Sequence, residues 1–500
     1  MKVYYDDSHT GSGKTERAID SIVKRKCKAL FVTERIESFD ELELWMRRKS
    51  AEHGTAPIID KVHGSQGYRL GSVSRQIKAL PIRHQFNDHV IVIATHEGMM
   101  LSEFSDFSEW DIIVDEVPAI LNFEEKATHL DAAFFQTHYR LDEVADGWCS
   151  VKVKDEEAKL TVANVRADQS HDHLALFHRR VLEASTEDSN RFVVANLPSW
   201  DAMSDAEVKW CWASAFSLKE LEPFKTVTVL GNRFRHNVGA LVSNSFSRDN
   251  IEWEPLPPPP NKRHFQFRHV HISYFSENRT ASRYLFESEQ GQAMLSEIGM
   301  RLAQELSGSD HIWMANAKER GLPSPRSLLS GAGMEDKKCL SPKQAGTNNH
   351  KHVSHAAAIY SAKGCPNLTA LLKLLDIDPA AWTTSIEHEA ILQFVTRTSV
   401  RDPNNCSPVR IWVFDRDQAL YLKTYFDGLG FASATMSLVP GGPTIPAKLK
   451  GGRRAKVYSP HEIDERKAIK TAKDRERKRR SRAREKQRLE AAAGEINKAA

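Results

Sequence analysis

A glycine-rich segment near the start of the chain has the residue types needed to hold a phosphate. Residues Ser8–Thr15 read Ser-His-Thr-Gly-Ser-Gly-Lys-Thr, between a β-type run, Lys2–Tyr5, and a helix-type stretch that begins near Glu16. Gly11 and Gly13 allow backbone geometry that a Cβ would block, so several N–H groups can point at one phosphate. The N-terminus of the following helix adds a favourable dipole. This context predicts a phosphate-binding loop.

The last two side chains of this loop would complete a nucleotide site. Lys14 would reach the β- and γ-phosphates of a nucleoside triphosphate, and the hydroxyl of Thr15 would ligate Mg²⁺. Ser8 stands where the plain pattern has glycine, a small departure. We therefore predict that the chain binds ATP and Mg²⁺. The predicted nucleotide-binding residues are Thr10, Gly11, Ser12, Gly13, Lys14 and Thr15.

Two adjacent carboxylates follow an apolar run about 100 residues further on. The segment from Trp110 to Pro118 reads Trp-Asp-Ile-Ile-Val-Asp-Glu-Val-Pro. A carboxylate at the end of such a strand, in a chain with a phosphate-binding loop, holds Mg²⁺ directly or through water. We predict this role for Asp115. Glu116 would then orient and deprotonate the water that attacks the γ-phosphate.

A third constellation lies in the second half of the chain. Gln393, Arg397 and Arg401 recur every four residues, which places them on one face if the segment is a helix. A guanidinium aimed at the γ-phosphate stabilises the charge of phosphoryl transfer. We predict this role first for Arg401 and second for Arg397, with Gln393 near the attacking water.

The elements that must position these residues alternate along the first 250 residues. β-Type runs alternate with helix-type stretches, a pattern that predicts a parallel sheet covered on both faces. Residues 125–210 are more polar and give no clear pattern. The predicted strands are Lys2–Tyr5, Ala29–Thr33, His89–Ala94, Asp111–Val114 and Thr226–Leu230, and the predicted helices include Glu16–Arg25 and Phe39–Lys49.

A proline-rich stretch divides the chain. Residues 255–260 read Pro-Leu-Pro-Pro-Pro-Pro, an extended and stiff spacer. A second α/β pattern follows it. We predict an N-terminal domain over residues 1–250, a linker over 251–262, a C-terminal domain over 263–440 and a basic tail over 441–500. In the second domain the predicted strands are Val270–Phe275, His311–Met314 and Val409–Phe414, and the predicted helix is Leu295–Leu306.

Together these motifs resemble those of superfamily 2 helicases of the DEAD/DEAH-like type, notably the forms encoded by phages and mobile elements. The phosphate-binding loop resembles motif I, and Asp115-Glu116-Val117-Pro118 resembles motif II. The further segments that fit in order are Phe31–Arg35 (motif Ia), Ala94–Gly98 (the Thr-His segment before motif II), Trp212–Phe216 (motif III, with Ser214), Gly346–Asn348 (motif V) and Gln393–Arg401 (motif VI).

The resemblance implies two tandem RecA-like P-loop NTPase domains with ATP bound between them. It implies an ATP-dependent helicase or translocase, with a role in phage or mobile-element DNA replication. Nucleic acid, DNA rather than RNA, would bind in the cleft between the domains, and replication proteins would be further partners. Within this family pattern Ser214 would couple the ATP state to the contacts with the strand.

Charge is distributed unevenly along the chain. The net charge is +4, but residues 451–500 alone carry +9, which leaves −5 on the rest. Basic tails of this kind commonly bind nucleic acid. The tail is rich in Arg and Lys without leucine at heptad spacing, so a leucine zipper is not indicated. We predict that it contacts the phosphate backbone without sequence preference.

Composition limits the other classes of protein. The longest apolar runs are a few residues, whereas a bilayer span needs about 20, so we expect no membrane segment and a cytoplasmic location. The six cysteines form no Cys-x-x-Cys pair, so the sequence indicates neither a zinc ribbon nor a disulfide framework. Two other functions stay open: a phage DNA-packaging motor ATPase with a nuclease domain, and a nucleic-acid-binding NTPase switch that does not unwind.

Overall fold

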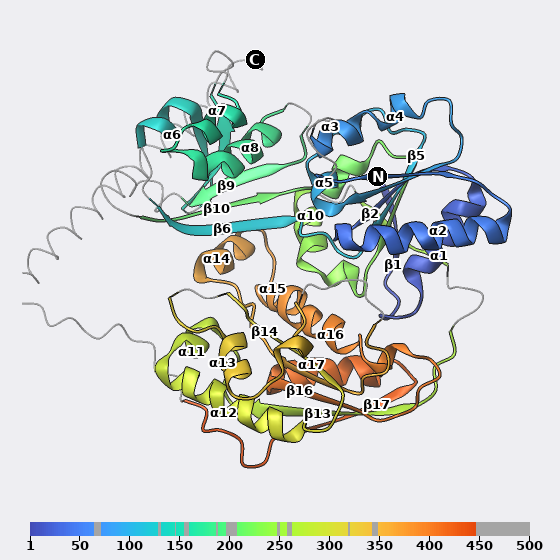
Figure 1. Ribbon diagram of the computed structural model, residues 1–500. Helices are drawn as coiled ribbons and strands as arrows, with labels where there is room; N and C mark the ends of the chain where they lie inside the picture. Colours follow the sequence, from blue (N-terminus) through green and yellow to red (C-terminus); the bar gives the residue numbers. More distant parts are fainter. Residues whose placement is uncertain are drawn as a thin grey trace, which may run out of the picture. The chain divides into compact units, whose positions relative to one another are not determined.

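The computed structural model places residues 1–446 in one compact unit. Within the first unit, two parallel sheets and one antiparallel sheet are each packed against helices (Figure 1). The α/β class with two parallel sheets, predicted from the sequence, is therefore confirmed. The structure describes residues 1–64, 72–128, 132–145, 147–154, 160–186, 189–196, 208–247, 251–257, 263–318, 321–342 and 349–446.

The first sheet is parallel and seven-stranded, in the order β12-β1-β11-β5-β2-β4-β3. Its central strands are buried on both faces, which is why they are continuous apolar runs. The strands are β1 (Lys2–Asp6), β2 (Lys28–Thr33), β3 (Ile58–Val62), β4 (Val90–Thr95), β5 (Trp110–Asp115), β11 (Thr226–Leu230) and β12 (Glu252–Pro255).

Alternate residues of these strands enter two different cores. Phe31 of β2 packs with α1 and α2, whereas its neighbours Leu30 and Val32 pack on the other face with α3, α5 and α10. The helices are α1 (Lys14–Arg25), α2 (Phe39–His53), α3 (Val73–Lys78), α4 (Leu80–Arg83), α5 (His96–Met100) and α10 (Val238–Ser247). Because all strands of the sheet are parallel, their carboxyl ends meet at one edge.

An antiparallel sheet interrupts this pattern between β5 and β11, in the order β6-β10-β9-β8-β7. Phe177 and Trp212 lie in the core between this sheet and its helices. The sequence pattern did not reveal this sheet, which occupies much of the uninterpreted region 125–210. Its elements are β6 (Leu121–Thr128), α6 (Ala132–His138), β7 (Tyr139–Ala145), β8 (Trp148–Val153), α7 (Val162–Ala167), α8 (Ala175–Ala184), β9 (Phe192–Asn196) and β10 (Val208–Ala215).

The second parallel sheet has the order β14-β15-β16-β13-β17. Helices α16 and α17 cover one face, and α11–α13 cover the other. The strands are β13 (Arg268–Ser276), β14 (His311–Ala315), β15 (His355–Ile359), β16 (Val409–Asp415) and β17 (Ala432–Leu438). The helices are α11 (Arg283–Glu287), α12 (Glu289–Glu305), α13 (Pro325–Gly331), α14 (Pro366–Leu374), α15 (Ala380–Trp382), a π-helix (Thr383–His388), α16 (Glu389–Val395) and α17 (Arg416–Asp427).

The two halves share more than the predicted boundaries suggest. Strand β12 lies inside the predicted linker 251–262 and pairs with β1 of the first sheet. Leu368, Leu371 and Leu372 of α14 belong by sequence to the second half, yet they are buried in the core of the first. A fragment cut at residue 250 would therefore lose part of its own sheet and expose apolar surface that α14 covers.

Among the described residues, no helix is both long and apolar enough to cross a bilayer.

Candidate active site

The predicted phosphate-binding loop connects the carboxyl end of β1 to the first turn of α1. Gly11 and Gly13 have φ of 84° and 88°, in the left-handed region that favours glycine. Helix α1 begins at Lys14, directly after Gly13, which has no side chain to cap the helix. The first N–H groups of α1 therefore face the loop, where an anion can accept from them.

Lys14 lies inside the loop. Its ammonium donates to the backbone carbonyls of Ser8 and His9, at 2.6 and 3.2 Å. Burial lowers the pKa of Lys14, because a desolvated ammonium is costly. A phosphate in the loop would supply the negative charge that favours the protonated form. This environment fits the predicted role of Lys14 as a phosphate ligand.

The predicted Mg²⁺ residues are adjacent. The hydroxyl of Thr15 donates to both carboxylate oxygens of Asp115, at 3.1 and 3.0 Å. Burial raises the pKa of Asp115 to about 6, and a bound cation would reverse that shift. One carboxylate and one hydroxyl suit Mg²⁺, which completes its shell with phosphate oxygens and water. Among the described residues, no group of three or more His, Cys, Asp or Glu could hold a metal ion.

Glu116 has an unusual backbone. Its φ is 69°, rare for a residue other than glycine, and its N–H donates to the carbonyl of Leu230 on the neighbouring strand at 2.7 Å. Burial raises the pKa of Glu116 to about 7, and the nearby Asp115 and Glu34 carboxylates add to this effect. A carboxylate that titrates near neutrality is suited to general-base catalysis.

This pKa predicts the pH dependence of ATP hydrolysis. A general base must be deprotonated, so kcat/KM for ATP should fall about tenfold per pH unit as pH drops below about 7. The folded chain binds the Glu116 proton more tightly than the unfolded chain does. Lowering the pH from about 7 toward 4.5 therefore raises this residue's contribution to the free energy of unfolding. A kcat/KM profile that stays flat down to pH 5, under conditions where unfolding is excluded, would contradict the assignment.

The two arginines reach this site from the second half of the chain. Arg397 is buried, and burial together with the nearby Arg401 lowers its pKa to about 10, while Glu116 acts in the opposite direction. A Cβ added to Gly11 would lie 3.2 Å from Cγ of Arg401, so the Arg401 side chain packs against the phosphate-binding loop. Both guanidinium groups are thus close enough to the Glu116 carboxylate for their charges to affect it.

The prediction that Gln393, Arg397 and Arg401 share one helix is wrong. Helix α16 ends at Val395, Arg397 lies in the following turn, and Arg401 ends a short 3-10 helix that starts at Ser399. The Thr396 and Thr398 hydroxyls donate to backbone carbonyls three or four residues earlier, at 2.8 and 2.7 Å. Such bonds compete with helix propagation.

Gln393 is half-buried on α16. Among the described residues, no hydrogen bond joins its side chain to the phosphate-binding loop, and its role near the attacking water stays a prediction.

Two further residues contact the site: Tyr425, which sequence reasoning missed, and His96, which lies in the predicted segment Ala94–Gly98. The hydroxyl of Tyr425 on α17 accepts from the N–H of Thr10 at 3.0 Å, across 415 positions of sequence. His96 is buried, which lowers its pKa to about 4. The neutral ring therefore donates from Nε2 to the carbonyl of Asp115 at 2.9 Å. The Thr-His pair in the sequence points to His96, whereas the sequence offers no signal for Tyr425.

The segment after β11 also reaches this edge of the sheet. The side-chain amide of Asn232 donates to the carboxylate of Glu389, the first residue of α16, at 3.2 and 3.1 Å. Arg233 has φ of 49°, and its guanidinium lies 5.7 Å from the ring centre of Tyr421. Asn232 therefore links the strand beside Glu116 to the helix that precedes Arg397.

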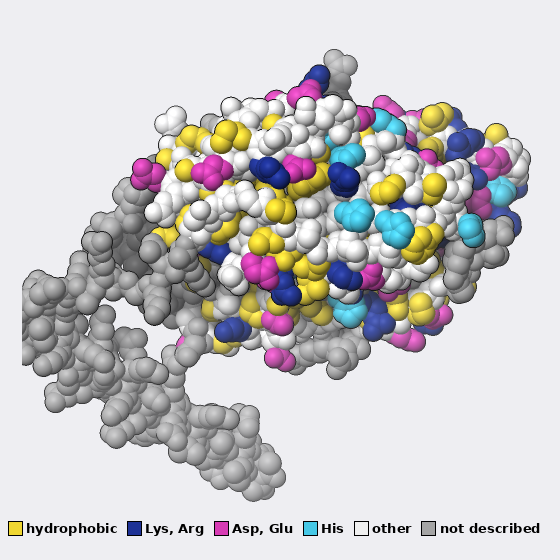
Figure 2. Space-filling model, turned by 90° about the horizontal axis from the view of Figure 1, so that it is seen from below, with side chains coloured by type: hydrophobic (Ala, Val, Ile, Leu, Met, Phe, Trp, Pro, Cys, Tyr) yellow, Lys and Arg dark blue, Asp and Glu magenta, His cyan; other side chains and the backbone are white. Residues whose placement is uncertain are grey.

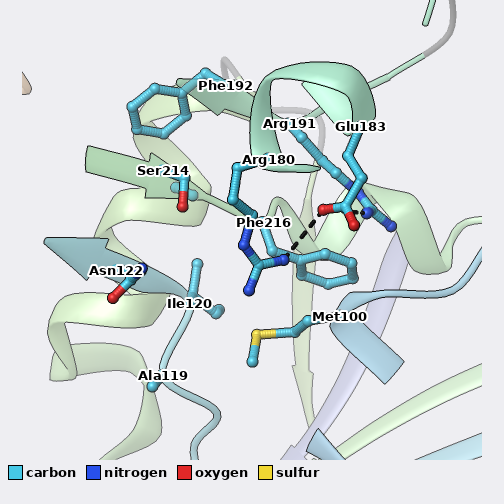
Figure 3. A pocket seen from close by; sticks show the side chains of 11 residues that line it. Met100, Ala119, Ile120, Asn122, Arg180, Glu183, Arg191, Phe192, Ser214 and Phe216 are labelled. Carbon is cyan, nitrogen blue, oxygen red and sulfur yellow. Dashed lines mark hydrogen bonds and ion pairs between the residues drawn. The ribbon is translucent and has the colours of Figure 1, made fainter. Parts of the chain in front are cut away.

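Ser214 lies elsewhere. It is buried on β10 of the antiparallel sheet and lines a small cavity with Asn122, Ile120 and Arg180 (Figure 3). The cavity volume is about 20 Å³, room for little more than one water molecule. Ser214 pairs with Asn122 on β6, the strand that follows Asp115 and Glu116 in the chain, and its coupling role stays a prediction.

Of the remaining predicted segments, Phe31–Arg35 runs along the end of β2, where Glu34 is half-buried and affects Glu116. Gly346–Asn348 lie outside the described residues.

A comparison with protein-family models found no match, and a comparison with curated proteins found none either. Among solved structures, the chain is similar to an XPD helicase, with 10% identity, a TM-score of 0.46, and coverage of 88% of this chain and 96% of that one. It is also similar to Xpd4 of S. tokodaii, with 12% identity, a TM-score of 0.43, and coverage of 87% and 96%. A third is S. cerevisiae Dbp5 bound to RNA and ADP-BeF3, with 10% identity, a TM-score of 0.37, and coverage of 87% and 85%. At these scores the likenesses are too distant to carry a function.

Proposed function

We propose that this protein is an ATP-dependent nucleic-acid helicase or translocase. The observation that supports it best is the composition of the site. The phosphate-binding loop and Glu116 come from the first sheet, whereas Arg397 and Arg401 come from the second half of the chain. A nucleotide bound there would contact both halves, and its hydrolysis would change those contacts. This is what a motor needs in order to open and close a cleft.

The proposed chemistry is in-line transfer of the γ-phosphoryl group to water. Lys14 and the N–H groups of α1 hold the phosphates, and Thr15 and Asp115 are the residues that would hold Mg²⁺. Bound Mg²⁺ would neutralise charge on the β- and γ-phosphates. Glu116 accepts a proton from the attacking water while the oxygen of that water forms a bond to the γ-phosphorus. The bond from that phosphorus to the β–γ bridging oxygen breaks, leaving ADP and phosphate, while Arg401 and Arg397 stabilise the developing charge.

The proposed substrate is DNA rather than RNA, and the proposed setting is phage or mobile-element replication in the cytoplasm, with replication proteins as partners. These finer points rest on the motif resemblance. The proposed domains are 1–250 and 263–440, joined by the linker 251–262 and followed by the tail 441–500. Strand β12 of the linker pairs with β1, and α14 of the second domain packs into the core of the first half.

The test is ATP hydrolysis by the full chain with and without single-stranded DNA or RNA, followed by strand displacement on tailed duplexes. Stimulation by nucleic acid together with displacement supports the proposal. A single turnover of ATP that nucleic acid does not stimulate would favour the NTPase switch. The packaging-motor alternative would require a metal-binding acidic cluster in the second half, and none occurs among its described residues.

Removing residues 451–500 tests the proposed role of the tail. The deletion removes a net charge of +9 and leaves −5. If the tail neutralises phosphates, affinity should fall about equally for all sequences. The log–log salt dependence should also flatten by roughly 0.7–0.9 per lost contact. Basal ATP hydrolysis should survive, since every proposed nucleotide-contacting residue precedes the tail. Titration of labelled single strands at two salt concentrations measures both quantities, and unchanged slopes would mean that the tail does not bind.

A further inference from the structure

An open groove lies between helix α3 of the first sheet and helices α7 and α8 beside the antiparallel sheet. Its volume is about 840 Å³. Three arginines line it, Arg75, Arg166 and Arg179, together with small apolar side chains such as Val162 and Ala163. No Asp or Glu is among its described lining residues. The groove is therefore basic at its rim and apolar between the charges.

Two of the three charges are available to a ligand. Arg179 pairs with Glu183 on its own helix, with Nε 3.0 Å from the carboxylate. Arg75 and Arg166 are exposed, and neither forms an ion pair with another described residue. Exposed guanidinium groups at the rim of a groove match phosphate oxygens, which they can bind in a bidentate manner.

The shape of the groove favours a polymer over a small anion. It is open along the surface and much larger than a single phosphate requires. Apolar patches between cationic groups suit a strand whose sugars and bases alternate with phosphates. The surface in Figure 2 differs from this groove, because basic, acidic and histidine side chains are interspersed among the described residues visible there. We propose that the groove between α3 and α7 binds single-stranded nucleic acid through its phosphates; this deepens the proposed function and rests on it.

A packed contact connects this groove to the nucleotide site. Helix α3, which carries Arg75, lies so close to α5 that a Cβ on Gly98 would be 2.9 Å from Cγ1 of Val73. Helix α5 begins with His96, whose ring donates to the carbonyl of Asp115. A shift of α3 on binding a strand would therefore press on α5 and on the backbone of Asp115. This provides a physical route for stimulation of ATP hydrolysis by nucleic acid.

The direct test is the double variant Arg75→Glu with Arg166→Glu, in the full chain. Binding of labelled oligo(dT) and oligo(U) would be followed by fluorescence anisotropy at several salt concentrations. We expect affinity to fall at least about tenfold, since each arginine makes a charge-assisted contact. The log–log salt slope should flatten by roughly 0.7 per lost contact. The two oligonucleotides show whether the groove distinguishes DNA from RNA.

The matched control is Arg410→Glu, which reverses an exposed arginine on β16, outside the groove. It should leave the affinity and the salt slope unchanged. The milder pair Arg75→Gln with Arg166→Gln serves if charge reversal disturbs folding, which thermal melts will reveal. Wild-type affinity and slope in a folded double variant would overturn the proposal, and so would an equal loss in the Arg410 variant.

Two further results separate this inference from the proposed function. If the wild type shows nucleic-acid-stimulated ATP hydrolysis but the groove variants bind normally, the groove assignment fails and the motor stands. If the groove variants lose binding but the wild type never hydrolyses ATP, the motor fails and the binding site stands. For the route through α5, Gly98→Ala should alter the ratio of stimulated to basal hydrolysis while oligonucleotide affinity stays unchanged.

Discussion

Replacing Glu116 with glutamine is expected to lower ATP turnover by about 10²–10⁴-fold, the range for loss of a general base. An amide cannot accept the proton of the attacking water. Nucleotide affinity should be retained, because Lys14 and Thr15 are untouched. The fold should be at least as stable, since the substitution removes a buried carboxyl beside Asp115.

Single-turnover hydrolysis and titration with a fluorescent ATP analogue separate these two effects. Glu109→Gln is the matched control, because Glu109 is an exposed acid just before the start of the same strand, where it pairs with Lys28. It should leave turnover near the wild-type value. Lys14→Ala provides the complementary result, abolishing turnover through loss of the phosphate ligand. Near-normal turnover in the Glu116 variant would remove this residue from the mechanism.

Replacing Arg401 with alanine is expected to lower ATP turnover by about 10³–10⁵-fold, the range for an arginine finger. The side chain is held against the phosphate-binding loop at Gly11, from the opposite half of the chain. Nucleotide affinity should change little, because stabilisation of charge is needed mainly in the transition state. The kcat for ATP should therefore fall far more than KM rises.

Two comparison variants sharpen this test. Arg401→Lys keeps a positive charge but loses the planar fork, so it should recover only part of the activity. Arg397→Ala measures whether the second guanidinium acts in the same step, and the double variant would then lose less than the product of the two single losses. An Arg401→Ala chain with wild-type kcat would show that the site does not use this arginine.

How well the sequence predicts a strand depends on the composition of that strand. Strands of the two parallel sheets that are unbroken apolar runs were predicted to within two residues at each end, as for Asp111–Val114 against the observed Trp110–Asp115. Such strands are buried on both faces, so their composition alone identifies them. Strand β15, His-Ala-Ala-Ala-Ile, was missed because alanine has low strand propensity and only the flanking strands β14 and β16 make it a strand.

The antiparallel sheet was not predicted because the sequence patterns of its strands are weak. Its strands carry polar residues on one face. In β7, the alternation of exposed side chains with buried or half-buried ones is incomplete. Their pairing partners are far apart in sequence, as with β6 and β10. The same sheet carries Ser214 on β10, and the coupling role of this residue stays a prediction.

The sequence by itself determined the local parts of the site. A phosphate-binding loop needs glycine where φ is positive, and a lysine and a threonine at the start of the next helix, and all of these lie within eight consecutive positions. The same holds for the apolar strand that ends in Asp115 and Glu116. These features depend on backbone geometry and on burial of one strand, which short-range patterns record.

Only the tertiary structure decided which distant residues complete the site. Tyr425 bonding to Thr10, Asn232 bonding to Glu389, and Arg401 packing on Gly11 all join segments more than 150 positions apart. The same is true of α14, which fills the core of the first half. Such contacts arise from packing between sheets and helices. The residues next to a hydroxyl, an amide or a leucine in the sequence do not indicate which distant partner it contacts in the folded chain.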